Sequence, residues 1–207
     1  GTDSAPEWSA TGFDAGSRGR RANEILTLLT RLWRDDDVCF DGRFYHYRDV
    51  TITPKPVQQP LPLWIGGSSD AAIERTARYG SGWLGGNQLP AQIGRVIGAI
   101  HARAAALERY IPADHYGTGI NYRFGSWNEP AVERATAVLA QRVGKEIDPR
   151  GYMAVGDRDD ILELIRVFRA VGVTKFVLRP LATDDDDLMR QTLRLDAEVV
   201  PEAHKLD

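Results

Sequence analysis

Residues 61–70, LPLWIGGSSD, form the segment of this chain best suited to bind a ligand. The apolar residues at 62–65 predict a short buried strand, and a turn then leads into a helix predicted over 71–79. Glycines in such a turn let the backbone approach a ligand closely, and hydroxyl groups stand beside the first free N–H groups of the helix. A helix start of this kind suits a phosphate or a carboxylate. The candidate ligand-binding residues are Gly66, Gly67, Ser68 and Ser69.

The same turn also has a purely structural interpretation. Ser68, Ser69 and Asp70 are of the residue types that cap the N-terminal end of a helix by accepting hydrogen bonds from its first N–H groups. Backbone N–H groups at a helix start can take part in a cap and in anion binding together. The residues of the turn therefore leave both interpretations open.

The composition is that of a globular protein and excludes several classes of partner. The chain has 207 residues, of which 43% are hydrophobic and 27% charged, so it can bury a core of one or two domains. A net charge of -3 gives no reason to expect nucleic acid or a membrane surface as a partner. A single cysteine excludes an internal disulfide, and no apolar run is long enough to span a bilayer. We therefore expect a cytoplasmic protein.

From residue 60 onward, short apolar segments alternate with segments of helical periodicity. Strands are expected at 62–65, 82–84, 116–124 and 175–178, and helices at 71–79, 90–108, 130–144, 159–171 and 188–200. This order predicts an α/β fold with parallel strands joined by crossover helices. Four such units cannot close a barrel of eight, so we expect this chain to be the C-terminal part of a longer protein.

The residues before position 60 follow a different pattern. A helix is expected over 17–34, because apolar residues recur there at helical spacing. An Asp-Gly pair at 41–42 between apolar residues predicts a β-hairpin, which we place in an insertion at 36–59. The first 16 residues are rich in glycine, serine, threonine and aspartate and predict a loop.

Several segments together resemble the bacterial luciferase-like monooxygenase superfamily. They are RGRRANE at 18–24, FDGRFY at 40–45, TPKPVQ at 53–58, WIGGSS at 64–69, ARYGSGW at 77–83 and GVTKFVLRP at 172–180. The resemblance implies a TIM (β/α)8 barrel that is incomplete here, with about strands 5–8, a preceding helix and the hairpin insertion in one domain over 1–207. It also implies that the first half of the barrel is not part of this sequence.

The resemblance implies a cofactor and a reaction as well. In the family the turn at 66–69 meets the flavin phosphate, and the cofactor is reduced FMN or, as the alternative, coenzyme F420. The expected activity is a flavin-dependent monooxygenase reaction in which reduced FMN and O2 oxidise a small organic substrate. Hydride transfer with F420 is the second hypothesis, and a non-catalytic flavin-binding or dimerisation module is the third. We expect a homo-oligomer and, for an FMN enzyme, a flavin reductase as a partner.

The candidate catalytic residues are Asn121, Arg123 and Arg179. Asn121 and Arg123 are two residues apart on a predicted strand and therefore face the same way. In the alkanesulfonate monooxygenase branch of the family these positions carry an arginine and a histidine, so this chain departs from that pattern. Arg123 is a permanent cation and cannot act as a general base, but it is suited to bind an anionic substrate or to stabilise negative charge. The alternative is an ion pair with a carboxylate in the barrel mouth.

Four further charged or flexible features need an interpretation. Arg179 follows the last strand, and its alternative role is an ion pair with the aspartates at 184–187. Those aspartates are expected to begin the final helix rather than to bind a metal, because no histidine or cysteine is near and carboxylates suit a helix start. The arginines at 18, 20 and 21 suit a helix start poorly, which suggests a ligand phosphate or partner carboxylates nearby. The resemblance places a lid at 141–156.

Overall fold

The computed structural model of the chain describes residues 5–12, 14–144 and 146–206. The N-terminal part contains helix α1 (Ala5–Thr11), a 3-10 turn and the long helix α2 (Arg18–Arg34), followed by an antiparallel hairpin of β1 (Val38–Asp41) and β2 (His46–Val50). The predicted helix and hairpin are confirmed. The loop predicted for the first 16 residues is wrong within the described part, because α1 and the 3-10 turn, capped by Asp14, lie there.

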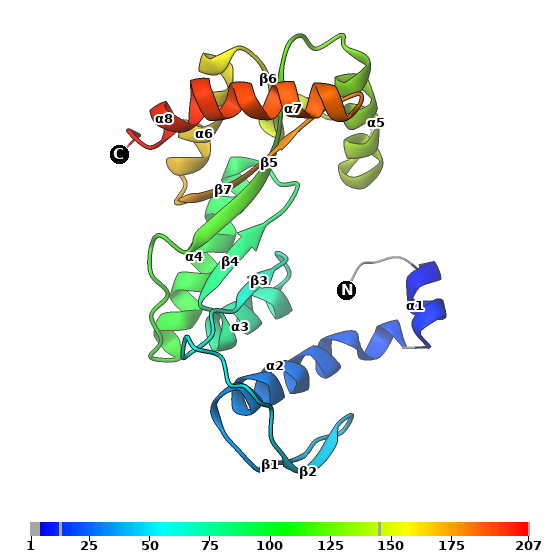
Figure 1. Cartoon of the computed structure of the whole chain (residues 1–207), viewed down its shortest axis with the longest axis vertical. Coiled ribbons are helices and arrows are strands. Elements are labelled where there is room, and N and C mark those ends of the chain that lie inside the picture. Colours follow the sequence, from blue (N-terminus) through cyan, green and yellow to red (C-terminus); the bar gives the residue numbers. More distant parts are fainter. Residues whose placement is uncertain (1–4, 13, 145, 207) are drawn as a thin grey trace.

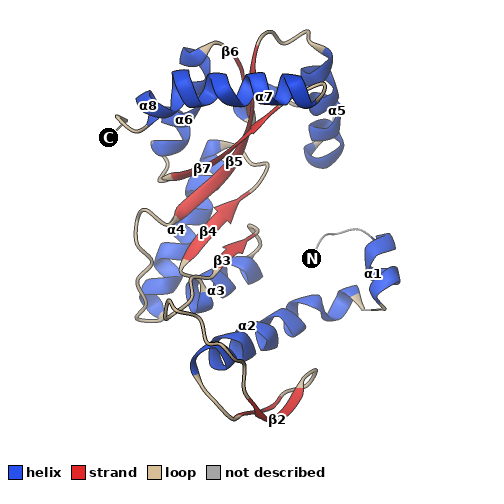
Figure 2. Ribbon diagram, in the orientation of Figure 1, coloured by secondary structure: helices blue, strands red, loops and turns tan. Residues whose placement is uncertain are grey.

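The central element is a parallel five-stranded sheet. Its strands are β3 (Trp64–Gly66), β4 (Gly82–Gly85), β5 (Tyr116–Phe124), β6 (Met153–Gly156) and β7 (Lys175–Pro180). Strand β5 pairs with β7 over 117–122, with β4 over 116–118 and with β6 over 121–124, so β4 and β6 follow one another along the same edge of β5. In the part of the chain that is described, the sheet is open rather than closed (Figure 2).

Most of the helices cover one face of this sheet. The main helices are α3 (Asp70–Tyr79), α4 (Pro90–Ala106), α5 (Pro130–Val143), α6 (Arg158–Arg169) and α7 (Asp185–Arg194), and the C-terminal end adds a π-helical turn and α8 (Val200–Ala203). The main core joins α3, α4 and α6 to buried side chains of β5 such as Ile120, Tyr122 and Phe124. Because side chains alternate along a strand, Gly119, Asn121 and Arg123 lie on the opposite face.

The structure adds one strand that the sequence did not predict. Residues 153–156, the end of the predicted lid at 141–156, form β6 and pair with β5. The strand is buried on both faces, since Ala154 belongs to the main core while Met153 and Val155 pack against α5. These four residues are thus part of the sheet, and the lid at 141–156 stays a prediction. Four apolar residues after Pro149 and Gly151 give too short a pattern to separate a buried strand from a loop.

The hairpin and helix α7 lie at opposite ends of the long axis of the molecule (Figure 1). Among the described residues, no helix is both long and apolar enough to cross a membrane.

Candidate functional site

The turn between β3 and α3 combines a helix cap with a close backbone approach. The Oγ of Ser69 accepts a hydrogen bond from the N–H of Ala72 at 3.3 Å, so the capping interpretation is confirmed for this residue. Gly67 has a φ of +97°, and its carbonyl accepts a hydrogen bond of 2.7 Å from the indole N–H of Trp83. Ser68 is exposed, and its hydroxyl makes no hydrogen bond within the described residues. The turn thus has an ordered backbone and a hydroxyl that is available to a ligand.

A hollow of about 790 Å³ opens in front of this turn. The turn and α3 contribute Gly66, Ser69, Ala71 and Arg75 to its lining, and the start of α2 with the hairpin contributes Arg18, Gly19, Arg21 and Tyr45. The N–H groups of Asp70 and Ala71 are the first of α3 and donate to no acceptor in the described part of the chain. Unpaired helix N–H groups and arginines around one hollow suit a phosphate.

Arg75 fixes the start of α2 against α3. Its Nε donates to Oδ1 of Asn23 at 2.7 Å, and its Nη2 donates to the carbonyl of Gly19 at 3.0 Å. A Cβ at position 19 would lie 2.8 Å from that Nη2, so the guanidinium needs a glycine there. Arg75 thereby holds the basic start of α2 beside the turn, although a helix start is an unfavourable place for cations.

The hairpin is held to the same part of α2. The backbone N–H groups of Arg43 and Phe44 each donate to the carboxylate of Glu24 at 2.9 Å. Burial alone would raise the pKa of Glu24, but these hydrogen bonds outweigh it and the pKa lies below its ordinary value. The guanidinium of Arg21 lies over the ring of Phe44 at 4.6 Å. The hairpin therefore packs against the arginine-bearing start of α2 and helps to fix the position of this side of the hollow.

Arg123 is a buried structural cation. Its Nε donates to Glu129 at 2.8 Å, and its Nη1 donates to Asp187 at 2.5 Å and to the carbonyl of Leu181 at 2.8 Å. Burial alone would raise the pKa of Asp187, but the hydrogen bonds from Arg123 and Thr183 lower it below its ordinary value. The side chain of Arg123 thus takes the alternative role foreseen for it, an ion pair at the end of the sheet.

Arg179 and Asn121 are adjacent on the open face of the sheet. The two residues are register partners across β5 and β7. A Cβ on Gly119 would lie 3.1–3.2 Å from Cζ and both Nη atoms of Arg179, so the guanidinium lies over that glycine. Within the described residues, neither side chain makes a hydrogen bond or an ion pair, so Arg179 does not pair with the aspartates at 184–187. Asp184 instead caps α7 by accepting from the N–H of Asp187 at 2.8 Å, as expected of a helix start.

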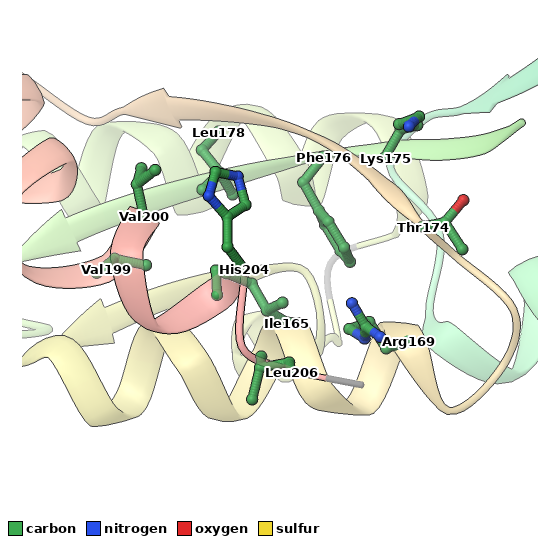
Figure 3. Close-up of a pocket in the computed structure, with 11 residues that line it drawn as sticks. Ile165, Arg169, Thr174, Lys175, Phe176, Leu178, Val199, Val200, His204 and Leu206 are labelled. Carbon is green, nitrogen blue, oxygen red and sulfur yellow. The ribbon is translucent and has the colours of Figure 1, made fainter. Parts of the chain in front are cut away.

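A second hollow, of about 460 Å³, lies on the opposite face of the sheet (Figure 3). It is formed by α6, β7 and the C-terminal residues, with Ile165, Phe176 and His204 among its lining side chains. Phe176 belongs to the covered face of β7, so this hollow is separate from the turn and from Arg179. Among the described residues, no group of three histidine, cysteine, aspartate or glutamate side chains could hold a metal ion.

Sequence reasoning missed the part played by Arg75. Its position, four residues after Ala71, places both on the same side of α3, and this spacing was the available signal. The candidate residues fall into three separate places. Ser69 and Gly66 line the large hollow, Asn121 and Arg179 lie on the open sheet face, and Arg123 is buried.

Comparison with known proteins gives this geometry a family. Residues 2–162 match the family model described as "Luciferase-like monooxygenase". The chain is 31% identical over 140 residues to the FMNH(2)-dependent dimethylsulfone monooxygenase of Pseudomonas putida, covering 67% of this chain and 36% of that protein. It is 32% identical over 71 residues to the F420-dependent glucose-6-phosphate dehydrogenase of Microbacterium testaceum, covering 34% of this chain and 21% of that protein.

A solved structure supports the fold. The monooxygenase RslO1 of Streptomyces bottropensis superimposes with a TM-score of 0.80 at 21% identity, covering 96% of this chain and 65% of that one. The chain spans about a third of the length of the FMNH(2)-dependent relative. The α/β fold of an incomplete luciferase-like barrel is thus confirmed. Because the family model matches well over half of its residues, the chain belongs to the luciferase-like monooxygenase family.

Proposed function

We propose that this chain carries the phosphate-binding turn and part of the substrate-facing sheet of a flavin-dependent oxidoreductase, which uses reduced FMN and O2 to oxidise a small organic substrate. The observation that carries the proposal is the shared hollow of the β3–α3 turn and three arginines, Arg18, Arg21 and Arg75. The dependence of a 31% identical relative on FMNH2 supports the choice of cofactor and supports a flavin reductase as its source.

The residues around the hollow fit the phosphate of FMN. The N–H groups of Asp70 and Ala71 and the hydroxyl of Ser68 would donate to its oxygens, and Arg18 would add positive charge. Arg75 acts as a positioning residue, since its donors are directed to Asn23 and Gly19. Bound reduced FMN would supply two electrons to O2, so that one oxygen atom can be transferred to the substrate and the other leaves as water, and the chain's own task is to hold and orient the cofactor.

A phosphate-dependent affinity is the direct test. We expect the chain to bind FMN about tenfold or more tightly than riboflavin, which lacks the phosphate, as followed by quenching of flavin fluorescence. Ser68→Ala and Ser69→Gly should reduce the difference in affinity between FMN and riboflavin. Glycine is chosen at position 69 because it keeps most of the helix cap. Equal affinity for the two flavins would overturn the phosphate assignment.

The arginine cluster offers a matched pair of variants. Arg18 lines the hollow, whereas Arg20, two residues along the same helix, is exposed and does not. Arg18→Gln should therefore weaken FMN binding several-fold, while Arg20→Gln should leave it nearly unchanged. Equal losses in both variants would show that only the overall charge of this helix matters.

The F420 enzyme is the second candidate function, and the match to an F420-dependent dehydrogenase favours it. Oxygen uptake that depends on an organic substrate and exceeds the spontaneous oxidation of reduced FMN supports the monooxygenase. Reduction of F420 by a hydride-donating organic substrate, without oxygen uptake, supports the dehydrogenase. Flavin binding with neither activity supports the third hypothesis, a binding module.

A further inference from the structure

We propose that Arg179 and Asn121 bind the negatively charged head group of the substrate, a carboxylate or a sulfonate. The inference rests on the proposed function, because it places the substrate on the open face of the same sheet. It adds the substrate class and the residues that select it.

The position of the pair is the first argument. Asn121 and Arg179 are register partners near the carboxyl ends of β5 and β7, and both lie on the face opposite the main core, where Asn121 is next to the buried Met153 of β6. Gly66, where the phosphate-binding turn begins, ends β3 in the same parallel sheet. In a parallel sheet the carboxyl ends of all strands lie at the same end of the sheet. Asn121 and Arg179 therefore lie at the same end as the phosphate-binding turn.

The availability of the guanidinium is the second argument. Arg179 lies over the backbone of Gly119, and no carboxylate of the described residues pairs with it. Arg123, another cation at this end of the sheet, is committed to Glu129 and Asp187. A planar fork of N–H donors that rests on a flat glycine surface suits bidentate recognition of an oxyanion. The amide of Asn121 can add one donor beside it.

The surroundings of the pair are the third argument. Val177, two residues before Arg179 on the same face, is 42% exposed, and Leu84 of β4 lies on this face beside Gly117. These side chains offer an apolar surface next to a guanidinium that forms no ion pair with any described residue. A small organic anion with an apolar body matches both features, whereas a neutral polar substrate would leave the guanidinium unpaired.

A pair of equal-sized probes tests the proposal. Hexanoate and hexanamide differ in charge but little in shape. Isothermal titration calorimetry of the chain, with and without FMN, measures the affinity for each of the two compounds. We expect hexanoate to bind about tenfold or more tightly than hexanamide, since hydrogen bonds to a charged group are the stronger kind. Hexanesulfonate in the same titration distinguishes the two head groups, and tighter binding of either anion supports the proposal.

Variants locate the effect. Arg179→Met should abolish the preference for the anion, Arg179→Lys should keep part of it, and Asn121→Ala should reduce it several-fold. Arg169→Met is the matched control, because Arg169 lies at the hollow on the opposite face, and it should keep the full preference. An absent preference in the unaltered chain, or a full preference in Arg179→Met, overturns the proposal. Failure to bind FMN with the preference intact would instead count against the proposed function.

Discussion

The guanidinium of Arg179 lies directly over Gly119 of the neighbouring strand. A Cβ at position 119 would stand 3.1–3.2 Å from three atoms of that group, which is closer than ordinary van der Waals contact. The absence of a side chain at position 119 thus sets the position of the guanidinium on the sheet. Asn121, one alternation further along β5, then lies beside it.

Gly119→Ala should displace Arg179 without unfolding the chain. Alanine is at least as well tolerated as glycine inside a strand, so the midpoint of thermal unfolding should fall little. The preference for hexanoate over hexanamide should drop several-fold, because the guanidinium loses its support. Gly98→Ala is the control, since a Cβ there meets nothing within 4 Å. An unchanged preference in Gly119→Ala would contradict the role given to this contact.

Arg75→Lys should weaken FMN binding although Arg75 is assigned no bond to the phosphate. A lysine has no planar fork and cannot reproduce both links, to Asn23 and to Gly19. The start of α2 would then be held less firmly beside the turn, and we expect the Kd for FMN to rise several-fold. Arg78→Lys, an exposed change on the same helix, should have no such effect. Equal Kd values for Arg75→Lys and the unaltered chain would refute the positioning role.

Removal of the buried cation should cost far more stability than removal of the exposed one. Arg123→Met leaves Asp187 with only its ion pair to the exposed Arg190 and removes the ion pair of Glu129, and breaking a buried pair costs about 3–5 kcal/mol in the free energy of unfolding. Arg179→Met removes no ion pair of the described residues and should cost little. Urea unfolding of both variants gives the comparison. If both variants lost a similar free energy of unfolding, Arg123 would not have the structural role, and Arg179 the binding role, that are assigned to them.

The sequence was sufficient for elements with a long or repeated pattern. Helix α2, the hairpin and the strands before α3 and α4 followed from periodicity and turn residues, because local chemistry decides them. Strand β6 could not be recognised, since its four residues are strand only through pairing with β5. The same limit explains Arg123, whose acceptor Asp187 lies 64 residues away in the sequence. Spacing along one strand predicted its face but not the partner that arrives from α7.

The pH dependence of stability tests the Arg123–Asp187 pair independently. The pKa of Asp187 lies below its ordinary value of 3.8 in the folded chain, because hydrogen bonds from Arg123 and Thr183 outweigh the effect of burial. A carboxyl with a lowered folded pKa stabilises the fold above its unfolded pKa, and this contribution is lost as the pH falls through the folded value. The free energy of unfolding should therefore decrease below a pH of about 4.

Asp187→Asn should be less stable at neutral pH and should lose less stability on acidification than the unaltered chain. Asp186→Asn, an exposed change in the same helix, should follow the unaltered chain at every pH. Urea unfolding at neutral pH and at about pH 3 measures the difference for each variant. Because Asp157 and Asp184 also have lowered pKa values, some acid sensitivity should remain in Asp187→Asn. If Asp187→Asn and the unaltered chain lost equal stability on acidification, the Asp187 carboxylate would not be ionised and paired as the structure places it.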